Sequence, residues 1–256
     1  TVPKERRIRP IHIWQSAAAI LFLLLASSVY LSTVGTKAET DLLQQYIPIA
    51  EMRSLTLPDG TKVQLNSKST LLYPQEFTGD SRSVFLLGEA NFKVKPDKKR
   101  PFIVKSNDLQ ITALGTEFNV SAYPESQEIA TTLISGSIRV DYNNLTTSVI
   151  LHPNEQFAYN RNNKKYDLSN PDMDDVTAWQ RGELVLQKMT LTDIINVLER
   201  KYPYTFVYSI KNLKNDRFSF RFKDNAPLEE VMEIIVNVVG QMDYRIVEDK
   251  CYLTRI

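Results

Sequence analysis

The sequence predicts a membrane-anchored chain with an all-β domain in its middle and a small open α/β domain at its C-terminal end. Three observations support this fold class. An uncharged apolar run occurs early, strand-sized segments follow at short intervals, and two strand–helix–strand units close the chain. A length of 256 residues with 43% hydrophobic residues is sufficient for two globular domains.

The early run lies between Arg9 and Lys37 and contains no Lys, Arg, Asp or Glu. A membrane-spanning helix needs about 20 apolar residues, which predicts a transmembrane helix over 13–34. Residues 1–12 carry four basic residues and one acidic residue, as cytoplasmic flanks do. We therefore expect them to be the end of a cytoplasmic segment, with 35–51 as an external linker.

Two other interpretations of this run stay open. A buried core helix can be apolar, and a cleaved signal peptide has the same order of charges, although its apolar core is shorter. The chain begins with Thr, not Met, so we expect that part of the cytoplasmic segment precedes it.

The region 52–166 has the sequence pattern of an all-β domain. Apolar and polar residues alternate on both sides of Pro58-Asp59-Gly60, which predicts a hairpin with a tight turn. Further turns are predicted near Gly88 and at Ser135-Gly136. Strand-sized runs recur about every 8–12 residues, the spacing of all-β folds.

The segment 167–181 is predicted to be a linker with a short turn or helix. It contains Asp172, Asp174 and Asp175, which superficially resemble calcium ligands. The spacing lacks the Gly and the distant Glu of a calcium loop. Acidic residues at a helix N-terminus are the favoured interpretation.

The region 182–256 is predicted to be the α/β domain. Thr190 and Asp193 have the spacing of a helix capping box, and a second helix is expected between Pro227 and Gly240. Leu191 and Leu228 occupy the first turn of the two helices, at a period of 37 residues. Two strand–helix–strand units of this size predict a small open α/β sandwich with both helices on one face.

Composition excludes several function classes. A formal net charge of +1 argues against direct nucleic-acid binding. Cys251 is the single cysteine, which excludes an internal disulfide and a cysteine-rich zinc site. His12 and His152 are far apart, and no glycine cluster could cradle a phosphate. We therefore expect no metal, no cofactor and no catalytic activity on an external substrate.

One position could react with itself. The hydroxyl of Thr116 follows Gly115, and in a strained backbone it could attack the Gly115 carbonyl carbon to form an ester. A glycine bulge followed by an ordinary strand residue is the favoured interpretation.

Five sequence pieces together resemble the FecR family of sigma regulators. They lie in order between Met52 and Asn160: LPDGTKVQLNSKSTLLYPQEF, R-x-V-x-L-x-GEA-x-F-x-V, RPFIV, LGTEFNVSAY and L-x-P-x-E-Q. The tail from Thr177 onward resembles the C-terminal domain of Bacteroidetes members, which is similar to the short N-terminal domain of secretins and TonB receptors.

This resemblance implies a single-pass inner-membrane anti-sigma factor with a cytoplasmic N-terminus and periplasmic C-terminal domains. It implies three partners: an extracytoplasmic-function sigma factor bound by the preceding cytoplasmic region, the N-terminal signalling domain of a TonB-dependent outer-membrane transducer, and regulatory proteases. Some members cleave themselves at the Gly-Thr bond that corresponds to Gly115-Thr116, and others keep it intact.

Edge addition is a hypothesis for binding the transducer. The runs RFSFRF and KCYLTRI alternate apolar and polar residues, which suits pairing with a partner strand. The candidate residues are Ser219 and Arg221 in the first run and Tyr252 and Thr254 in the second. That both runs are ordinary interior strands is equally compatible with the pattern.

A periplasmic glycan- or wall-binding module without a signalling role is the alternative function. It would bind through exposed aromatic residues such as Tyr202, Tyr204 and Tyr208. Packing within the domain accounts equally well for these tyrosines.

Overall fold

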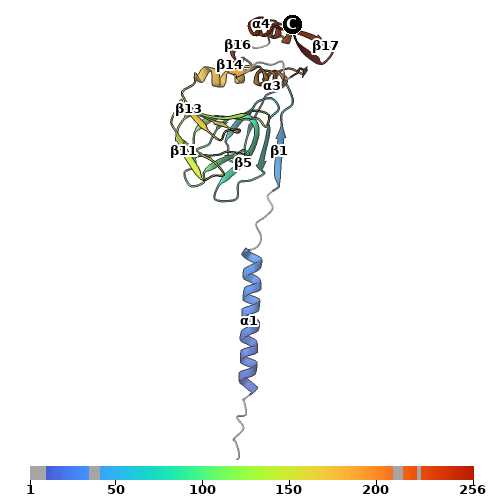
Figure 1. Ribbon diagram of the computed structural model, residues 1–256. Helices are drawn as coiled ribbons and strands as arrows, with labels where there is room; N and C mark the ends of the chain where they lie inside the picture. Colours follow the sequence, from blue (N-terminus) through green and yellow to red (C-terminus); the bar gives the residue numbers. More distant parts are fainter. Residues whose placement is uncertain (1–9, 35–40, 210–215, 224–225) are drawn as a thin grey trace, which may run out of the picture. The chain divides into compact units, whose positions relative to one another are not determined.

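Figure 1 shows the protein as a computed structural model. The structure describes residues 10–34, 41–209, 216–223 and 226–256, and in the first range it describes the side chains of residues 14–15 and 18–30. The chain divides into two compact units, residues 1–40 and 41–256, which are described separately below.

The first unit contains helix α1, Pro10–Val34. In the part of the chain that the structure describes, no helix combines the length and apolar content needed to cross a membrane. The span predicted over 13–34 is therefore not confirmed and stays a prediction. Most of the predicted cytoplasmic end, and residues 35–40 of the predicted linker, lie outside the described residues.

The second unit begins with thirteen strands joined in one curled sheet, which we call the β domain (Figure 1). The strands are β1 Leu42–Tyr46, β2 Arg53–Thr56, β3 Lys62–Leu65, β4 Thr70–Pro74, β5 Arg82–Lys93, β6 Phe102–Lys105, β7 Gln110–Ala113, β8 Glu117–Ala122, β9 Glu128–Ser135, β10 Ile138–Tyr142, β11 Thr147–Leu151, β12 Gln156–Asn160 and β13 Tyr166–Ser169. The predicted all-β character of this region is confirmed.

Strand β5 joins the two halves of the curled sheet. Its first half pairs with β4 and with β6, the latter in parallel, and its second half pairs with β3 and β8. The turn predicted near Gly88 is wrong, because the strand runs through this residue without reversing. Gly88 has φ +107°, and a Cβ there would lie 2.5 Å from Ser69 Oγ, so this crossing point requires glycine.

The other predicted turns exist, with one difference in pairing. Leu55 lies opposite Val63 across the β2–β3 hairpin, as predicted. The chain also turns at Gly136, where φ is +92°. However, β9 pairs with β8 and β12, whereas β10 pairs with β7 and β11. The turn therefore carries the chain from one half of the sheet to the other, and the two halves enclose one hydrophobic core.

The segment after residue 40 differs from the prediction. The sequence predicts a linker over 35–51, but Leu42–Tyr46 form β1, which pairs antiparallel with β4. Ile47, which follows β1, is fully buried in the core of the β domain. The polar residues Gln44 and Gln45 interrupt the apolar pattern, so the sequence does not indicate this strand. Its partner strand β4 lies about 28 residues further along the chain.

The linker between the two domains contains helix α2, Met173–Thr177, and the 3-10 helix η1, Ala178–Arg181. The carboxylate of Asp172 caps α2 and accepts a hydrogen bond from the backbone N of Asp174 at 2.9 Å. The predicted role of these acidic residues at a helix N-terminus is confirmed. We use "linker" below for α2 and η1.

The C-terminal domain contains both predicted strand–helix–strand units. Its elements are β14 Leu184–Thr190, α3 Leu191–Lys201, β15 Thr205–Val207, β16 Arg217–Phe222, α4 Leu228–Val239, β17 Met242–Val247 and β18 Lys250–Arg255. The strands of this α/β domain are divided between two sheets: β14 pairs with β16, and β15–β18–β17 form the second sheet. Apolar residues of both helices and both sheets meet in one core, which is why neither sheet needs to be large.

Candidate functional site

A cleft with both polar and apolar wall residues lies where the β domain meets the linker and the C-terminal domain. It consists of two adjoining pockets, of about 310 and 680 Å³, which share several wall residues. The hydrophobic core of the β domain and that of the C-terminal domain have no residue in common. The polar groups around this cleft therefore do most to define how the domains meet.

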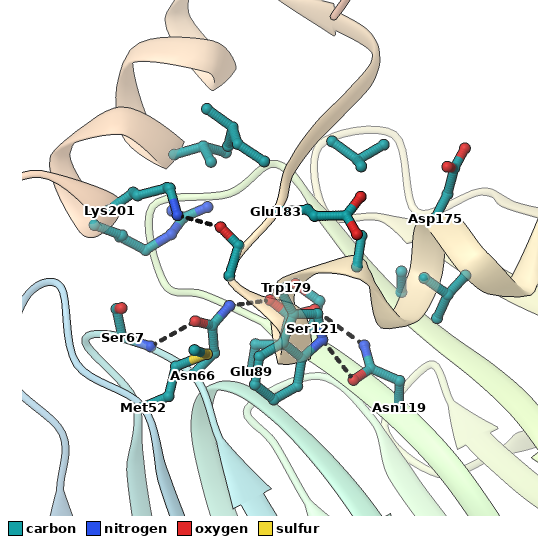
Figure 2. A pocket seen from close by; sticks show the side chains of 18 of the residues that line it. Met52, Asn66, Ser67, Glu89, Asn119, Ser121, Asp175, Trp179, Glu183 and Lys201 are labelled. Atoms are coloured by element: carbon teal, nitrogen blue, oxygen red, sulfur yellow. Dashed lines mark hydrogen bonds between the residues drawn. The ribbon is translucent and has the colours of Figure 1, made fainter. Parts of the chain in front are cut away.

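Glu89, in the second half of β5, lies in the wall of the cleft between two asparagines (Figure 2). Asn66 Nδ2 donates to Glu89 Oε2 at 2.8 Å, and Asn119 Nδ2 donates to Oε1 at 3.0 Å. Enclosure of the carboxyl group raises the pKa of Glu89, and the two amide donors and the charge of Arg200 oppose this shift.

Trp179 of η1 connects the linker to this group. Its indole Nε1 donates to Asn119 Oδ1 at 3.3 Å, so Asn119 bridges Glu89 and Trp179 (Figure 2). Asn119 is 5% exposed, and its position on the central strand β8 makes it a rigid support.

Arg200, near the end of α3, attaches the C-terminal domain to the β domain. Its Nη1 lies 2.7 Å from Glu125 Oε1, and its guanidinium lies 3.8 Å from the centroid of the Tyr123 ring. Its carbonyl accepts a hydrogen bond from Ala50 N at 3.0 Å. Arg200 is only 8% exposed, so these contacts replace water around a charged group.

A second charged cluster joins the linker to β16. Arg221 Nη2 lies 2.7 Å from Asp174 Oδ2 and 2.9 Å from Glu183 Oε2, and Nη1 contacts Asp175. Hydrogen bonding by Arg221 lowers the pKa of Asp174, and that by Arg181 lowers the pKa of Glu183. These side chains are partly exposed, so the cluster is accessible to salt.

The four candidate partner residues do not form one site. Arg221 is engaged by the linker, and Ser219 Oγ accepts a hydrogen bond from Lys188 N at 2.9 Å. Tyr252 and Thr254 lie on β18, the central strand of its sheet. Strand β18 pairs with β17 along its length and with β15 over Lys250–Tyr252, so edge addition is blocked there.

The possible self-cleavage position lies at a strained turn before β8. Gly115 has φ +147°, and a Cβ there would lie 2.8 Å from Pro96 Cα. Thr116 is 7% exposed, and its Oγ1 has no hydrogen-bond partner. This geometry fits the glycine bulge, and the structure does not show cleavage.

The remaining candidates have structural roles. His152 is exposed in a turn, where its backbone N donates to Glu155 Oε2 at 2.8 Å. Cys251 is buried in the C-terminal core. Within the described residues, no group of three His, Cys, Asp or Glu is arranged to hold a metal ion.

The tyrosines of the alternative function are packed within the C-terminal domain. All three lie against its core, and the hydroxyl of Tyr202 donates to Ala226 O at 2.7 Å. Burial raises the pKa of Tyr202 to about 12. They do not form the exposed aromatic platform that glycan binding would use.

The residues that join the domains do not stand out in the sequence. Glu89 occurs there only as part of a family motif, and Arg200 resembles any basic residue in the last turn of a helix. The one available signal is Trp179, a large aromatic side chain in an otherwise polar segment.

Comparison with known proteins identifies the family. The model of the FecR protein family matches residues 47–139, and that of the FecR C-terminal region matches 183–253. The comparison with curated proteins returned no match.

Two solved structures of a proposed anti-sigma factor from Parabacteroides distasonis ATCC 8503, at 2.50 and 1.65 Å resolution, are similar. Each is 34% identical and covers 84% of this chain; the chain covers 100% and 99% of them, with TM-scores of 0.79 and 0.78. The order of the two matched regions, the fold and this identity over whole solved chains show that the protein belongs to the FecR family.

Proposed function

We propose that this protein is a sigma-factor regulator of the anti-sigma type. The observation that carries the proposal is the occurrence of both FecR regions, in order, in a chain 34% identical to proposed anti-sigma factors along their solved length. The sigma factor would be an extracytoplasmic-function sigma factor, bound on the cytoplasmic side of the membrane.

The membrane arrangement is part of the proposal. The uncharged segment 13–34 would cross the inner membrane once, with the basic residues 1–12 inside and both folded domains in the periplasm. Regulatory proteases would then act on the chain to release the sigma factor.

The signal would come from the N-terminal signalling domain of a TonB-dependent outer-membrane transducer. Strand β16 is the better of the two predicted docking strands, because in the described part of the chain it pairs only with β14. An added strand would bond to the backbone of β16. Ser219 and Arg221 would shape this edge, and Tyr252 and Thr254 become secondary candidates.

Sigma regulation is tested by reporter transcription. A reporter controlled by an extracytoplasmic-function sigma factor of the same organism should change its output when the gene for the protein is deleted. The full-length protein should also co-purify with that sigma factor. A deletion that leaves every such reporter unchanged, together with no co-purification, would contradict the proposal.

The docking strand is tested by binding of residues 41–256 to transducer signalling domains. Replacing Ser219 with proline removes a backbone donor from β16 and should abolish binding. Thr254→Pro on β18 tests the secondary candidate strand in the same assay, with circular dichroism to verify that both variants remain folded. Equal binding by wild type and a folded Ser219→Pro variant would exclude β16.

A further inference from the structure

We propose that Glu89 is a positioning residue that, through Asn119 and Trp179, holds the linker and the C-terminal domain docked on the β domain. This inference goes beyond the proposed function, because it concerns a contact within the chain and does not depend on a sigma factor or a transducer.

The direction of each hydrogen bond follows from the chemistry of the partners. An ionised carboxylate only accepts, an indole N–H only donates, and an asparagine amide does each at one end. The Nδ2 of Asn119 donates to Glu89, and its Oδ1 accepts from Trp179. With Glu89 as acceptor, one orientation of Asn119 serves both neighbours, and the flipped amide would set a donor against the Trp179 N–H.

Asn66 fixes the other oxygen of Glu89 in the same way. Its Oδ1 accepts from the backbone N of Ser67 at 2.8 Å, so its Nδ2 must point away from that group and toward Glu89. Both carboxylate oxygens therefore face donors whose orientations are set elsewhere. A neutral side chain of the same shape cannot accept from both asparagines, because one of its two ends must donate.

The hydrogen bonds from Trp179 to Asn119 and from Asn119 to Glu89, which we call the relay, are important for docking because of how the domains otherwise meet. The two hydrophobic cores are separate, and the cleft lies between them. The linker contacts the β domain through the hydrogen bond from Trp179 to Asn119. The described contacts of the C-terminal domain with the β domain include the ion pair of Arg200 with Glu125 and the hydrogen bond from Ala50 N to the Arg200 carbonyl. Interfaces of this polar kind permit relative domain motion.

The chain already contains a fluorescent probe for docking of the linker. The sequence contains two tryptophans, Trp14 and Trp179, so residues 41–256 carry only Trp179. The relatives whose crystal structures were solved span 84% of this chain, which indicates that this part folds by itself. The fluorescence of Trp179 and its quenching by acrylamide therefore measure docking of the linker directly.

The first variant is Glu89→Gln in residues 41–256. A flipped Asn119 would set its amide donor against the Trp179 N–H and leave that part-buried donor unpaired, which should shift the docked-to-undocked ratio by about tenfold. We expect Trp179 emission to shift to longer wavelength, acrylamide quenching to rise, and proteolysis to cut between residues 170 and 183. Ser121→Ala, in the same cleft, is the matched control and should behave as wild type.

A charge swap tests the relay specifically. In the double variant Glu89→Gln with Asn119→Asp, the introduced glutamine amide can accept from Asn66 and donate to the new carboxylate, which still accepts from Trp179. We expect this pair to restore wild-type quenching and protease resistance. Asn119→Asp alone sets two carboxylates against each other, which should displace residue 119 from Trp179 and undock the linker. If Glu89 only filled space, Glu89→Gln, which has nearly the same shape, would stay docked without the second substitution.

A variant on the linker side covers the case in which Glu89→Gln does not fold. Trp179→Phe removes the indole donor without touching the β domain and should expose the same segment to protease. Wild-type quenching and protease resistance in a folded Glu89→Gln variant, failure of the double swap to restore docking, or full protease resistance of Trp179→Phe would each overturn the proposal.

Discussion

The β domain and the C-terminal domain use arginine in opposite ways. In the β domain, the side chain of Arg82 is 1% exposed and lies 2.7 Å from Asp59 Oδ2, whose side chain is 4% exposed. In the C-terminal domain, Arg221 is 45% exposed and faces three acidic residues that are 21–58% exposed.

The partners of the two arginines explain the difference. Arg82 also donates to the carbonyls of Lys95 and Arg100, and Thr61 donates to Asp59, so one buried network ties the β2–β3 turn and the β5–β6 loop to β5. Arg221 instead joins β16 to the linker, a separate element. A buried network stabilises the interior of a domain. An exposed cluster can join two separate structural elements and also allow them to dissociate.

The largest expected effect is at Arg82. Arg82→Met leaves the carboxylate of Asp59 buried without its partner, which should cost about 3–5 kcal/mol of unfolding free energy. Urea unfolding of residues 41–256, followed by circular dichroism, measures this loss. Arg53→Met is the control, because the Arg53–Glu51 pair is half-exposed at 3.6 Å. A similar loss in both variants would remove the contrast between buried and exposed arginines.

A smaller effect is expected at Gly88. Gly88→Ala forces a side chain onto a backbone with φ +107° and against Ser69, which should destabilise the β domain by about 2–4 kcal/mol. Gly240→Ala in the C-terminal domain is the matched case, because its φ is +68° and no atom lies within 4 Å of the added Cβ. The Gly240→Ala variant should lose about 1 kcal/mol of unfolding free energy, from backbone strain alone. Equal urea midpoints for the two variants would contradict the role of β5 as a crossing strand.

Cys251 reports on the core of the C-terminal domain. Burial raises the pKa of its thiol to about 11, so the native thiolate fraction at pH 8 should be roughly a hundredfold below that of the unfolded chain. Reaction with a thiol reagent should be slow in buffer and fast in urea. Because the folded pKa is raised, this thiol should reduce stability progressively as pH rises from about 9 to about 11. Fast labelling in buffer would show that this core opens readily.

The smallest effect is expected at Arg221. Arg221→Gln removes exposed ion pairs, so the urea midpoint should change little, and the change should vanish in high salt. Protease sensitivity of the linker should rise at low salt while both domains stay folded. A large, salt-independent fall in the urea midpoint would mean that the cluster stabilises a domain interior, as the Arg82 network does.

Local features of this fold could be predicted from the sequence. The Thr190–Asp193 cap, the acidic start of α2, the β2–β3 hairpin and Gly240 at the end of α4 depend on residues within a few positions of each other. Helix caps and tight turns depend on short-range geometry, so their residue types carry the information.

Long-range pairings could not be predicted in this way. The parallel β5–β6 pair, strand β1 beside β4 and the separate sheets of the C-terminal domain join segments whose own patterns are compatible with several partners. The pattern around Gly88 predicts a turn that does not exist, because glycine permits a positive φ in a turn and in a crossing strand alike.

The sequence by itself determined the order of the regions, the β character of the middle, the two strand–helix–strand units and the resemblance to the FecR family. Only the tertiary structure decided which strands pair and that Arg200 and Trp179 meet the β domain beside Glu89. The physical reason is distance along the chain: Asn119 and Trp179, 60 positions apart, form one hydrogen-bonded group, and no local pattern encodes that meeting.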